Sequence, residues 1–359
     1  MTPIRIGLAG CGAISETYYA PALRELERTG EVQVVALMDP SPERTALFKD
    51  GFPGASFLGG LAGMSKARPD LVIVASPPRF HAEQTVALLK AGIPVLCEKP
   101  MANTVAEAEE MAAAARDSGK ALAIGLFRRF FPALRAMREI IARGSLGPVR
   151  SFSIAEGGVF GWPAQSASFF QKASSKGGVL LDAGVHALDI VQWWFGEPSE
   201  LAYADDAMGG LEANCRVEMG YGAFSGQVQL SRDTQLANRY VVQCEKAWMA
   251  WNPLETNRFE LQFEGTGQAL AVMTHPSPPD KYRTRLKTPD ADFYGCFINQ
   301  LRNARAAVLG EEEVFIPAEE GIKSLRLIER CYGERKFLEM PWLSERENRQ
   351  AAALAGGDL

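Results

Sequence analysis

The chain has 359 residues, of which 47% are hydrophobic and 23% are charged, and its formal net charge is −5 at pH 7. This length and composition are typical of a globular protein with two domains. The negative net charge argues against a nucleic-acid partner. No apolar run approaches the roughly 20 residues that span a bilayer.

The cysteines lie scattered along the chain without a C-x-x-C pair. In a chain of this length the pattern favours reduced thiols over a disulfide framework or a zinc site, and we assign no metal ligands. The first strand begins at Ile4 without a basic region and a long apolar run before it, so we expect no signal peptide. These features predict a soluble, cytoplasmic protein.

Residues 4–9 are typical of a buried strand and run into a G-x-G-x-x-S turn that opens a helix. A second strand over residues 32–38 ends at Asp39. This order of strand, glycine turn, helix, strand and acid is the fingerprint of a dinucleotide-binding unit. Gly10 would allow the tight turn, and Gly12 would let the backbone approach a pyrophosphate at the helix N-terminus.

Asp39 is placed to accept hydrogen bonds from the adenosine ribose hydroxyls of such a cofactor. The 2′-phosphate of NADP would meet a like charge there, so the sequence favours NAD over NADP. Arg44 lies nearby and could compensate for that charge, which keeps NADP as the alternative. A glycine string by itself also fits an ordinary strand-to-helix turn, and only its flanks favour the dinucleotide site.

The alternation continues with strands over 71–75, 93–97 and 121–124 and with helices over 80–91 and 104–118. Strands that alternate with helices predict a parallel, doubly wound sheet, which binds ligands at the carboxyl ends of its strands. The residues that we assign there to cofactor binding are Gly10, Gly12, Ala13, Ile14, Asp39, Ser76, Pro77, Pro78, His81, Glu98 and Lys99.

Two residues at these strand ends have more than one possible role. His81 stands just inside its helix, where a local structural role is more usual for histidine than a catalytic one. Lys99 leaves an apolar strand and is followed by Pro100, which restricts the residue before it to an extended conformation. An ammonium held at the mouth of a nucleotide cleft can stabilise a developing alkoxide, although a solvated surface lysine is the alternative.

After residue 125 the pattern changes. A helix over 132–143 and a strand over 149–155 lead into an irregular stretch over 156–178, which we read as a wall or lid of a substrate pocket. Seven short strand-like runs follow between 201 and 273 and predict an open, mostly antiparallel sheet. An open sheet face is a natural surface for a homodimer or homotetramer.

Two helices, over about 293–309 and 318–334, complete the second part. The predicted fold class is therefore α/β, with an N-terminal Rossmann domain over 1–125 and a C-terminal α/β domain over 126–345 that binds substrate and mediates oligomerisation. The last residues, 346–359, are expected to form a tail without order. There are no internal repeats.

One apolar helix from Gly178 to a stop at Gly196 carries three polar residues, Asp182, His186 and Asp189. Their i, i+4, i+7 spacing places them on one stripe of the helix. Burying such groups is costly unless each has a partner, so the stripe predicts either an internal network or one wall of a cleft. Gly184, where Ala would favour the helix by about 1 kcal/mol, predicts that another segment approaches the backbone closely.

These motifs resemble the glucose–fructose oxidoreductase/inositol dehydrogenase (Gfo/Idh/MocA) family over nearly the whole length of the chain. The motifs that carry the resemblance are Gly10–Ser15, Ser76-Pro77-Pro78 with His81, Glu98-Lys99-Pro100, and Gly178 with Asp182-Ala183-Gly184-Val185-His186. The resemblance implies NAD(P)-linked oxidation or reduction of sugars, cyclitols or related hydroxy compounds. It also implies that Lys99, Asp182 and His186 form the catalytic group.

The chemistry of these side chains agrees with that assignment. Hydride removal from a secondary alcohol needs a base for the hydroxyl proton, and histidine titrates near neutrality, so His186 is expected to be the general base or acid. Lys99 would stabilise the alkoxide, and Asp182 would orient Lys99 or bind a substrate hydroxyl. Asp189 could orient the imidazole, but we favour a structural hydrogen bond for it.

The substrate itself is not predicted, because residues 126–130 and the aromatic stretch 156–178 match no subfamily pattern. Further pocket candidates, each more often structural than functional, are Arg128, Glu156, Trp162, Lys172 and Tyr294. Two alternative functions keep the same scaffold. One is a glycosidase that uses bound NAD for a transient oxidation, and the other is a non-enzymatic sensor of NAD or sugar.

Overall fold

The computed structural model of the chain describes residues 3–164, 167–274, 291–340 and 343–355. The chain divides into two compact units, each with its own β-sheet. The first unit comprises Met1–Phe127, Pro163–Ser166 and Pro279–Leu325. The second unit comprises Arg128–Trp162, Ala167–Pro278 and Arg326–Leu359.

The first unit is built on a six-stranded parallel sheet in the order β3-β2-β1-β4-β5-β6. Its strands are β1 (Ile4–Ala9), β2 (Val32–Met38), β3 (Ser56–Leu58), β4 (Leu71–Val74), β5 (Val95–Cys97) and β6 (Leu122–Ile124). Strand order reverses between β1 and β4, which makes this the switch point of a doubly wound sheet. The predicted N-terminal Rossmann fold is confirmed.

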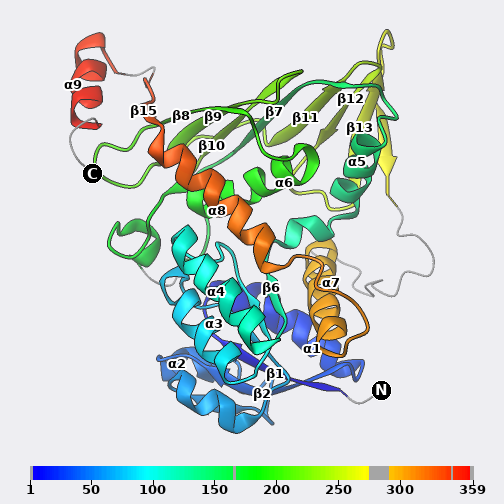
Figure 1. The fold of residues 1–359 in the computed structure, drawn as a ribbon, viewed down its shortest axis with the longest axis vertical. Helices are drawn as coiled ribbons and strands as arrows, with labels where there is room; N and C mark the ends of the chain where they lie inside the picture. Colours follow the sequence, from blue (N-terminus) through cyan, green and yellow to red (C-terminus); the bar gives the residue numbers. More distant parts are fainter. Residues whose placement is uncertain (1–2, 165–166, 275–290, 341–342, 356–359) are drawn as a thin grey trace. The chain divides into compact units, whose positions relative to one another are not determined.

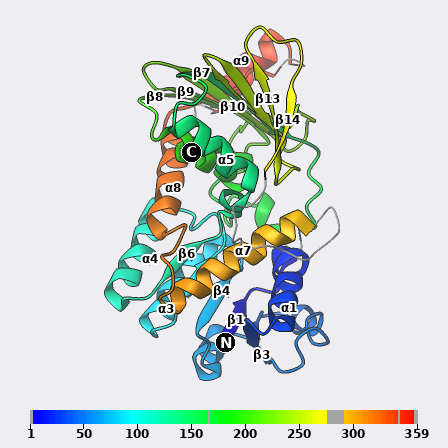
Figure 2. The same ribbon diagram turned by 90° about the vertical axis from the view of Figure 1, so that its right-hand side faces the viewer.

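Helices cover both faces of this sheet. They are η1 (Ser15–Tyr19), α1 (Ala20–Arg28), α2 (Pro42–Ala46), η2 (Leu61–Ala67), η3 (Pro78–Phe80), α3 (His81–Lys90), α4 (Val105–Ser118) and α7 (Ala291–Val308). Figure 2 shows α3 and α4 on one side of the sheet and α1 on the other, and α7 packs against α1. A capping box fixes the start of α4, because Thr104 and Glu107 each accept a backbone N–H from the other.

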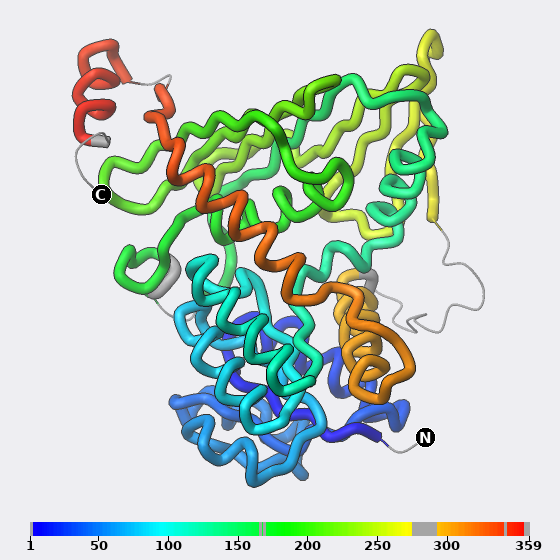
Figure 3. Tube along the Cα trace, viewed as in Figure 1, coloured from blue at the N-terminus to red at the C-terminus, as the bar shows by residue number. Residues whose placement is uncertain are grey.

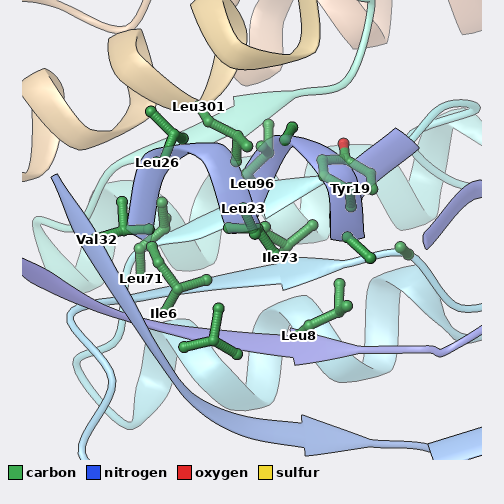
Figure 4. Packing of buried hydrophobic residues seen from close by; sticks show 14 of the residues in the cluster. Ile6, Leu8, Tyr19, Leu23, Leu26, Val32, Leu71, Ile73, Leu96 and Leu301 are labelled. Carbon is green, nitrogen blue, oxygen red and sulfur yellow. The ribbon is translucent and has the colours of Figure 1, made fainter. Parts of the chain in front are cut away.

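A single hydrophobic cluster joins the strands to α1 and α7. In Figure 4 the side chain of Leu23 from α1 lies over Ile73 from β4, and Leu26 from α1 lies beside Leu301 from α7. Figure 3 shows α7, in orange, beside α1, in blue, although the two helices lie near opposite ends of the chain. The core of the Rossmann unit is therefore completed by a helix from the C-terminal part of the sequence.

The second unit contains a nine-stranded mixed sheet in the order β14-β13-β12-β11-β7-β10-β9-β8-β15. Its strands are β7 (Val149–Gly157), β8 (Glu200–Asp205), β9 (Asn214–Gly220), β10 (Ser225–Ser231), β11 (Arg239–Cys244), β12 (Ala247–Trp251), β13 (Arg258–Phe263), β14 (Leu270–Met273) and β15 (Arg335–Phe337). The β7–β10 and β8–β15 pairs are parallel and the other described pairs are antiparallel, as predicted for the greater part of the sheet.

Alternation along the strands gives this sheet one apolar and one polar face. In β9, Cys215, Val217 and Met219 are buried, whereas Arg216 and Glu218 between them are exposed. The remaining helices of this part of the chain are η4 (Phe127–Phe130), α5 (Pro132–Ala142), η5 (Ala167–Phe170), η6 (Leu180–Gly184), α6 (Val185–Phe195), α8 (Ala318–Gly333) and α9 (Glu345–Ala355). Figure 1 shows α5 and α6 against one face of the sheet.

The structure differs from the sequence-based expectations in a few segments. Residues 291–325, expected in the second domain, belong to the first unit, because the apolar side of α7 packs on α1. Helix α9 occupies Glu345–Ala355, where a tail without order was expected, and residues 356–359 lie outside the described residues. The short elements α2, β3 and β15 were not predicted. No helix in the described ranges is long and apolar enough to cross a membrane.

Candidate functional site

The glycine turn after β1 packs directly against the turn after β4. Gly10 has a φ of +98°, and a Cβ on it would lie 2.5 Å from the backbone nitrogen of Ser76. Its N–H donates to the carbonyl of Met38 at 2.7 Å, and the Ser15 hydroxyl donates to its carbonyl at 2.6 Å. Only glycine fits this position, and the turns at the ends of β1, β2 and β4 meet there as predicted.

The residues around this turn fit a bound dinucleotide. Among the described residues, an added Cβ at Gly12 would meet only the Arg44 Nη1 within 4 Å, at 3.7 Å, so the backbone is open where a pyrophosphate would approach. Asp39 is fixed at the end of β2, because its carboxylate accepts the N–H groups of Cys11 and Ser41, both at 2.9 Å. The acid and the open glycine thus lie at the same strand ends, as a ribose and a pyrophosphate require.

His81 is fully buried and joins two of the predicted cofactor-binding turns. Its Nδ1 lies 2.9 Å from the carbonyl of Pro100, and its Nε2 lies 2.7 Å from the carbonyl of Ser76. Burial lowers the pKa of the imidazole, whereas these carbonyls act to raise it. The sequence places His81 among the cofactor-binding residues and favours a local structural role over a catalytic one; in the structure its ring nitrogens connect the turns that follow β4 and β5.

Glu98 and Lys99 follow β5, and the Lys99–Pro100 peptide bond is cis. The Glu98 carboxylate accepts the backbone N–H of Lys99 at 2.9 Å and the hydroxyl of Tyr19 at 2.6 Å. Burial raises the pKa of this carboxyl, against the lowering effects of Tyr19 and Lys99. Glu98 thus holds the backbone N–H of Lys99, and Tyr19 is a contributor that its position in the sequence did not reveal.

In the second unit, the predicted apolar helix forms as η6 followed by α6 and ends at Gly196. Its first five residues are a π-helical turn, a feature that is frequent at functional sites. The close approach predicted at Gly184 is confirmed: a Cβ there would lie 2.6 Å from Leu230 Cδ1 of β10. Strand β10 thus packs against the helix at the level of the polar stripe.

Asp182 lies on this helix and forms an ion pair with Arg232, which directly follows β10. The Arg232 Nη2 lies 3.0 Å from Asp182 Oδ2, and the two side chains are 11% and 26% exposed. The Arg232 guanidinium also lies over the ring of Phe160, 5.4 Å from its centroid. The segment that was read as a pocket wall therefore contacts the partner of Asp182.

The other two residues of the stripe are more deeply buried. His186 is 7% exposed and Asp189 is 1% exposed. Asp189 accepts three hydrogen bonds from Arg129, the shortest at 2.6 Å, and the Arg129 guanidinium lies 5.4 Å from the ring of Trp193. The structural role that we favoured for Asp189 agrees with this ion pair.

The N-terminus of the same helix is held by Glu212, which the sequence analysis did not single out. One carboxylate oxygen of Glu212 accepts the N–H groups of Gly178 and Leu180, at 2.9 and 3.0 Å, and the hydroxyl of Tyr332 at 2.8 Å. Glu212 is 1% exposed. A buried carboxylate at a helix N-terminus stabilises the free N–H groups of the first turn and so fixes the segment that carries Asp182.

Two of the further pocket candidates form a structural cluster. Arg128 donates two hydrogen bonds to the Glu156 carboxylate, at 2.6 and 2.8 Å, and one to the Tyr240 hydroxyl at 2.9 Å. The other candidates lie on packing or surface contacts: Tyr294 faces the ring of Tyr18, and Lys172 donates to a loop carbonyl at an exposed position. Trp162 is half-buried.

The parallel sheet with its glycine turn and anchored acid defines an NAD(P)-binding Rossmann unit. It is joined in one chain to an α/β unit with an open mixed sheet, an arrangement shared by a class of two-domain oxidoreductases. The oxidoreductase family model with an NAD-binding Rossmann fold matches residues 4–126, and the GFO/IDH/MocA C-terminal domain matches residues 134–250. The chain belongs to the Gfo/Idh/MocA oxidoreductase family.

Curated relatives and solved structures agree with this family. D-glucoside 3-dehydrogenase of Escherichia coli is 32% identical over 202 residues, which cover 55% of this chain and 56% of the relative. Trans-1,2-dihydrobenzene-1,2-diol dehydrogenase of Bos taurus is 31% identical over 268 residues, or 70% of this chain and 76% of the relative. The crystal structure of aldose-aldose oxidoreductase from Caulobacter crescentus superposes with a TM-score of 0.78 at 24% identity, covering 92% and 97% of the two chains.

The matched region spans little more than half the length of several of the curated relatives, such as the 56% of the Escherichia coli enzyme. These relatives are named for oxidation of sugars or diols.

Proposed function

We propose that the chain is an NAD-dependent dehydrogenase that transfers a hydride between a nicotinamide cofactor and a CH–OH group of a sugar, sugar derivative or cyclitol. The observation that carries this proposal is the combination of an open, acid-flanked glycine turn with a fixed Glu98–Lys99 segment at the neighbouring strand end. Relatives named as sugar and diol dehydrogenases support it, and neither the glycosidase nor the sensor gains support from them.

In this proposal the catalytic residues are Lys99 from the first unit and Asp182 and His186 from the second. When bound, the nicotinamide cofactor supplies the hydride acceptor or donor. His186 accepts the hydroxyl proton in oxidation and returns it in reduction, and Lys99 stabilises the negative charge that develops on the substrate oxygen. Asp182, held by Arg232, binds a substrate hydroxyl or orients Lys99.

We propose NAD as the preferred cofactor because the Asp39 carboxylate is fixed by two backbone N–H groups at the end of β2. A 2′-phosphate would have to approach this charge, and Arg44 would be the residue to offset it. The pyrophosphate would lie at Gly10, Gly12, Ala13 and Ile14, and the nicotinamide against Pro77 and Pro78, with Ser76 as a further cofactor-binding residue.

Two further parts of the proposal concern assembly and location. The polar face of the nine-stranded sheet would form the contact of a homodimer or homotetramer, since its exposed side chains carry both charges, as in Arg216 and Glu218. We expect a cytoplasmic enzyme that acts on a small-molecule substrate and has neither a nucleic-acid nor a membrane partner.

The proposal is tested by a panel of sugars, sugar acids, polyols and cyclitols with NAD and NADP in parallel, followed at the absorbance of the reduced nicotinamide. Net NADH formation with at least one compound supports a dehydrogenase. Cofactor binding with no turnover of any compound would contradict it, and so would product formation from a glycoside without net release of NADH.

A further inference from the structure

A buried chain of hydrogen bonds reaches from helix α7 to the backbone of Lys99. Gln300 Nε2 donates to the Tyr19 hydroxyl at 3.1 Å, and this hydroxyl donates to Glu98 Oε1 at 2.6 Å. The second carboxylate oxygen, Oε2, accepts the N–H of Lys99 at 2.9 Å. Gln300, Tyr19 and Glu98 are 3%, 0% and 5% exposed, and all these residues belong to the first unit.

Gln300 is only half satisfied in this chain. Its Oε1 atom is buried and has no hydrogen-bond partner among the residues that the structure describes. Burying a polar atom without a hydrogen-bond partner is costly, so an apolar side chain of similar size would serve the packing of α7 better. The Nε2 of the same Gln300 amide donates to the Tyr19 hydroxyl. This contact indicates that Gln300 serves to bind that hydroxyl and not to fill the core.

The packing of α7 fixes this amide over Tyr19. Phe297, one helical turn before Gln300, stacks on Tyr18 with the ring centroids 4.9 Å apart and meets Tyr19 edge-on at 5.2 Å. Figure 4 shows Tyr19 at one end of the hydrophobic cluster that joins α1 and α7. Because residues three apart share a helix face, Phe297 and Gln300 both contact Tyr19.

We propose that Tyr19 and Gln300 are positioning residues for Lys99: they hold the Glu98 carboxylate in the orientation that fixes the Lys99 backbone. This inference rests on the catalytic role proposed for Lys99. The Tyr19 hydroxyl and the Lys99 N–H donate to opposite oxygens of the Glu98 carboxylate and so fix its orientation. Without the Tyr19 hydroxyl, the carboxylate could rotate.

The charges around Glu98 give this network a pH dependence. The titratable groups that act on Glu98 and on its Tyr19 partner are Cys97 and Lys99, beside Glu98 in the chain. Gln300 does not titrate. Burial raises the pKa of the Glu98 carboxyl and the Tyr19 hydroxyl lowers it, so removing that hydroxyl lets Glu98 take up a proton at a higher pH.

The test uses the full-length enzyme with Tyr19→Phe, Gln300→Leu and a matched control, Tyr221→Phe, whose hydroxyl donates to the Gly196 carbonyl at 3.4 Å in the second unit. Hydrogen exchange of the Lys99 amide is measured on peptide fragments. Because Pro100 has no amide hydrogen, fragments that end at Glu98 and at Pro100 differ in exchangeable amides only by that of Lys99. Steady-state kinetics across pH and the Kd for NAD are measured on the same proteins.

We expect faster exchange of the Lys99 amide in Tyr19→Phe and Gln300→Leu and no change in Tyr221→Phe. In Tyr19→Phe, kcat should fall by up to about a hundredfold with the Kd for NAD nearly unchanged. The acid limb of its pH profile should also move to higher pH.

Wild-type exchange in both variants would overturn the inference, as would faster exchange with wild-type kcat and pH profile. If the exchange responds but the wild-type protein oxidises no substrate of the panel, the proposed function fails while the link from Tyr19 to Lys99 stands.

Discussion

The ion pair between Arg129 and Asp189 should be a structural support whose removal has a recognisable pH signature. The two side chains are 4% and 1% exposed and joined by hydrogen bonds as short as 2.6 Å. Replacing Arg129 by Met would leave the Asp189 carboxylate buried without this counter-charge. Breaking a buried pair on one side typically costs about 3–5 kcal/mol.

The loss of stability in Arg129→Met has an upper limit, because the Asp189 carboxyl can take up a proton in the folded state. Protonating an aspartate costs about 4 kcal/mol at pH 7 and about 1.5 kcal/mol at pH 5. In Arg129→Met the folded state would bind a proton that the unfolded state releases, so its stability should fall as the pH rises. The deficit relative to wild type should therefore be about 4 kcal/mol at pH 7 and closer to 1.5 kcal/mol at pH 5.

The assay is chemical unfolding at both pH values, followed by tryptophan fluorescence. The five tryptophans among the described residues lie in the second unit, so their signal reports the unit that contains this pair. The matched control is the double variant Arg129→Met/Asp189→Leu, in which no carboxyl remains to be protonated. It should recover most of the stability and show no extra pH dependence.

The reasoning would be refuted by a deficit in Arg129→Met that is equal at the two pH values. A double variant as unstable as the single one would also refute it, because the loss would then come from packing, for example of Arg129 on Trp193, and not from charge.

Three further predictions concern the glycine turn after β1, the acid at the end of β2, and the helix formed by η6 and α6. Gly12→Val should fold like wild type, because among the described residues its Cβ would meet only Arg44, at 3.7 Å, but it should bind NAD more weakly when measured by calorimetry. Gly10→Ala should instead unfold the Rossmann unit, as followed by circular dichroism, because its Cβ would lie 2.5 Å from the Ser76 nitrogen. A Gly12→Val protein that still binds NAD tightly would contradict the assigned pyrophosphate position. Asp39→Asn, which removes the negative charge and keeps the shape of the side chain, should raise the ratio of kcat/KM for NADP to kcat/KM for NAD at least about tenfold, a gain of about 1.4 kcal/mol. An unchanged ratio would show that Asp39 does not select the cofactor. Glu212→Leu should lower the free energy of unfolding by about 1–3 kcal/mol for each backbone N–H that it leaves unsatisfied, measured by urea unfolding, and a neutral effect would mean that other groups hold the start of the site helix.

Local sequence pattern was sufficient for much of the fold. Strands β1 and β2 and helices α4, α5 and α6 were predicted within a few residues, since their apolar periods and their Thr, Pro and Gly boundaries are encoded locally. The close contact at Gly184 was also predictable, because a glycine inside an apolar helix implies a near neighbour.

The partners of the polar residues were not predictable, because they depend on pairings between distant segments. Arg232 reaches Asp182 only because β10 runs parallel to β7 in the middle of the sheet, a pairing that no local pattern specifies. Gln300 reaches Tyr19 because α7 crosses to the Rossmann unit, although its sequence position suggested the second domain. Local motifs were therefore enough to propose the candidate site residues, whereas the contacts that hold them depend on tertiary pairings.

The most direct test of the proposed hydride transfer compares wild type with Lys99→Ala and His186→Ala on the best substrate of the panel. Both variants should fold and bind NAD with nearly wild-type affinity, while kcat falls by at least about a hundredfold, as expected for loss of a general base or of alkoxide stabilisation. Wild-type turnover in both variants would contradict the account. Loss of fold or of NAD binding in both would instead make these residues part of a structural network.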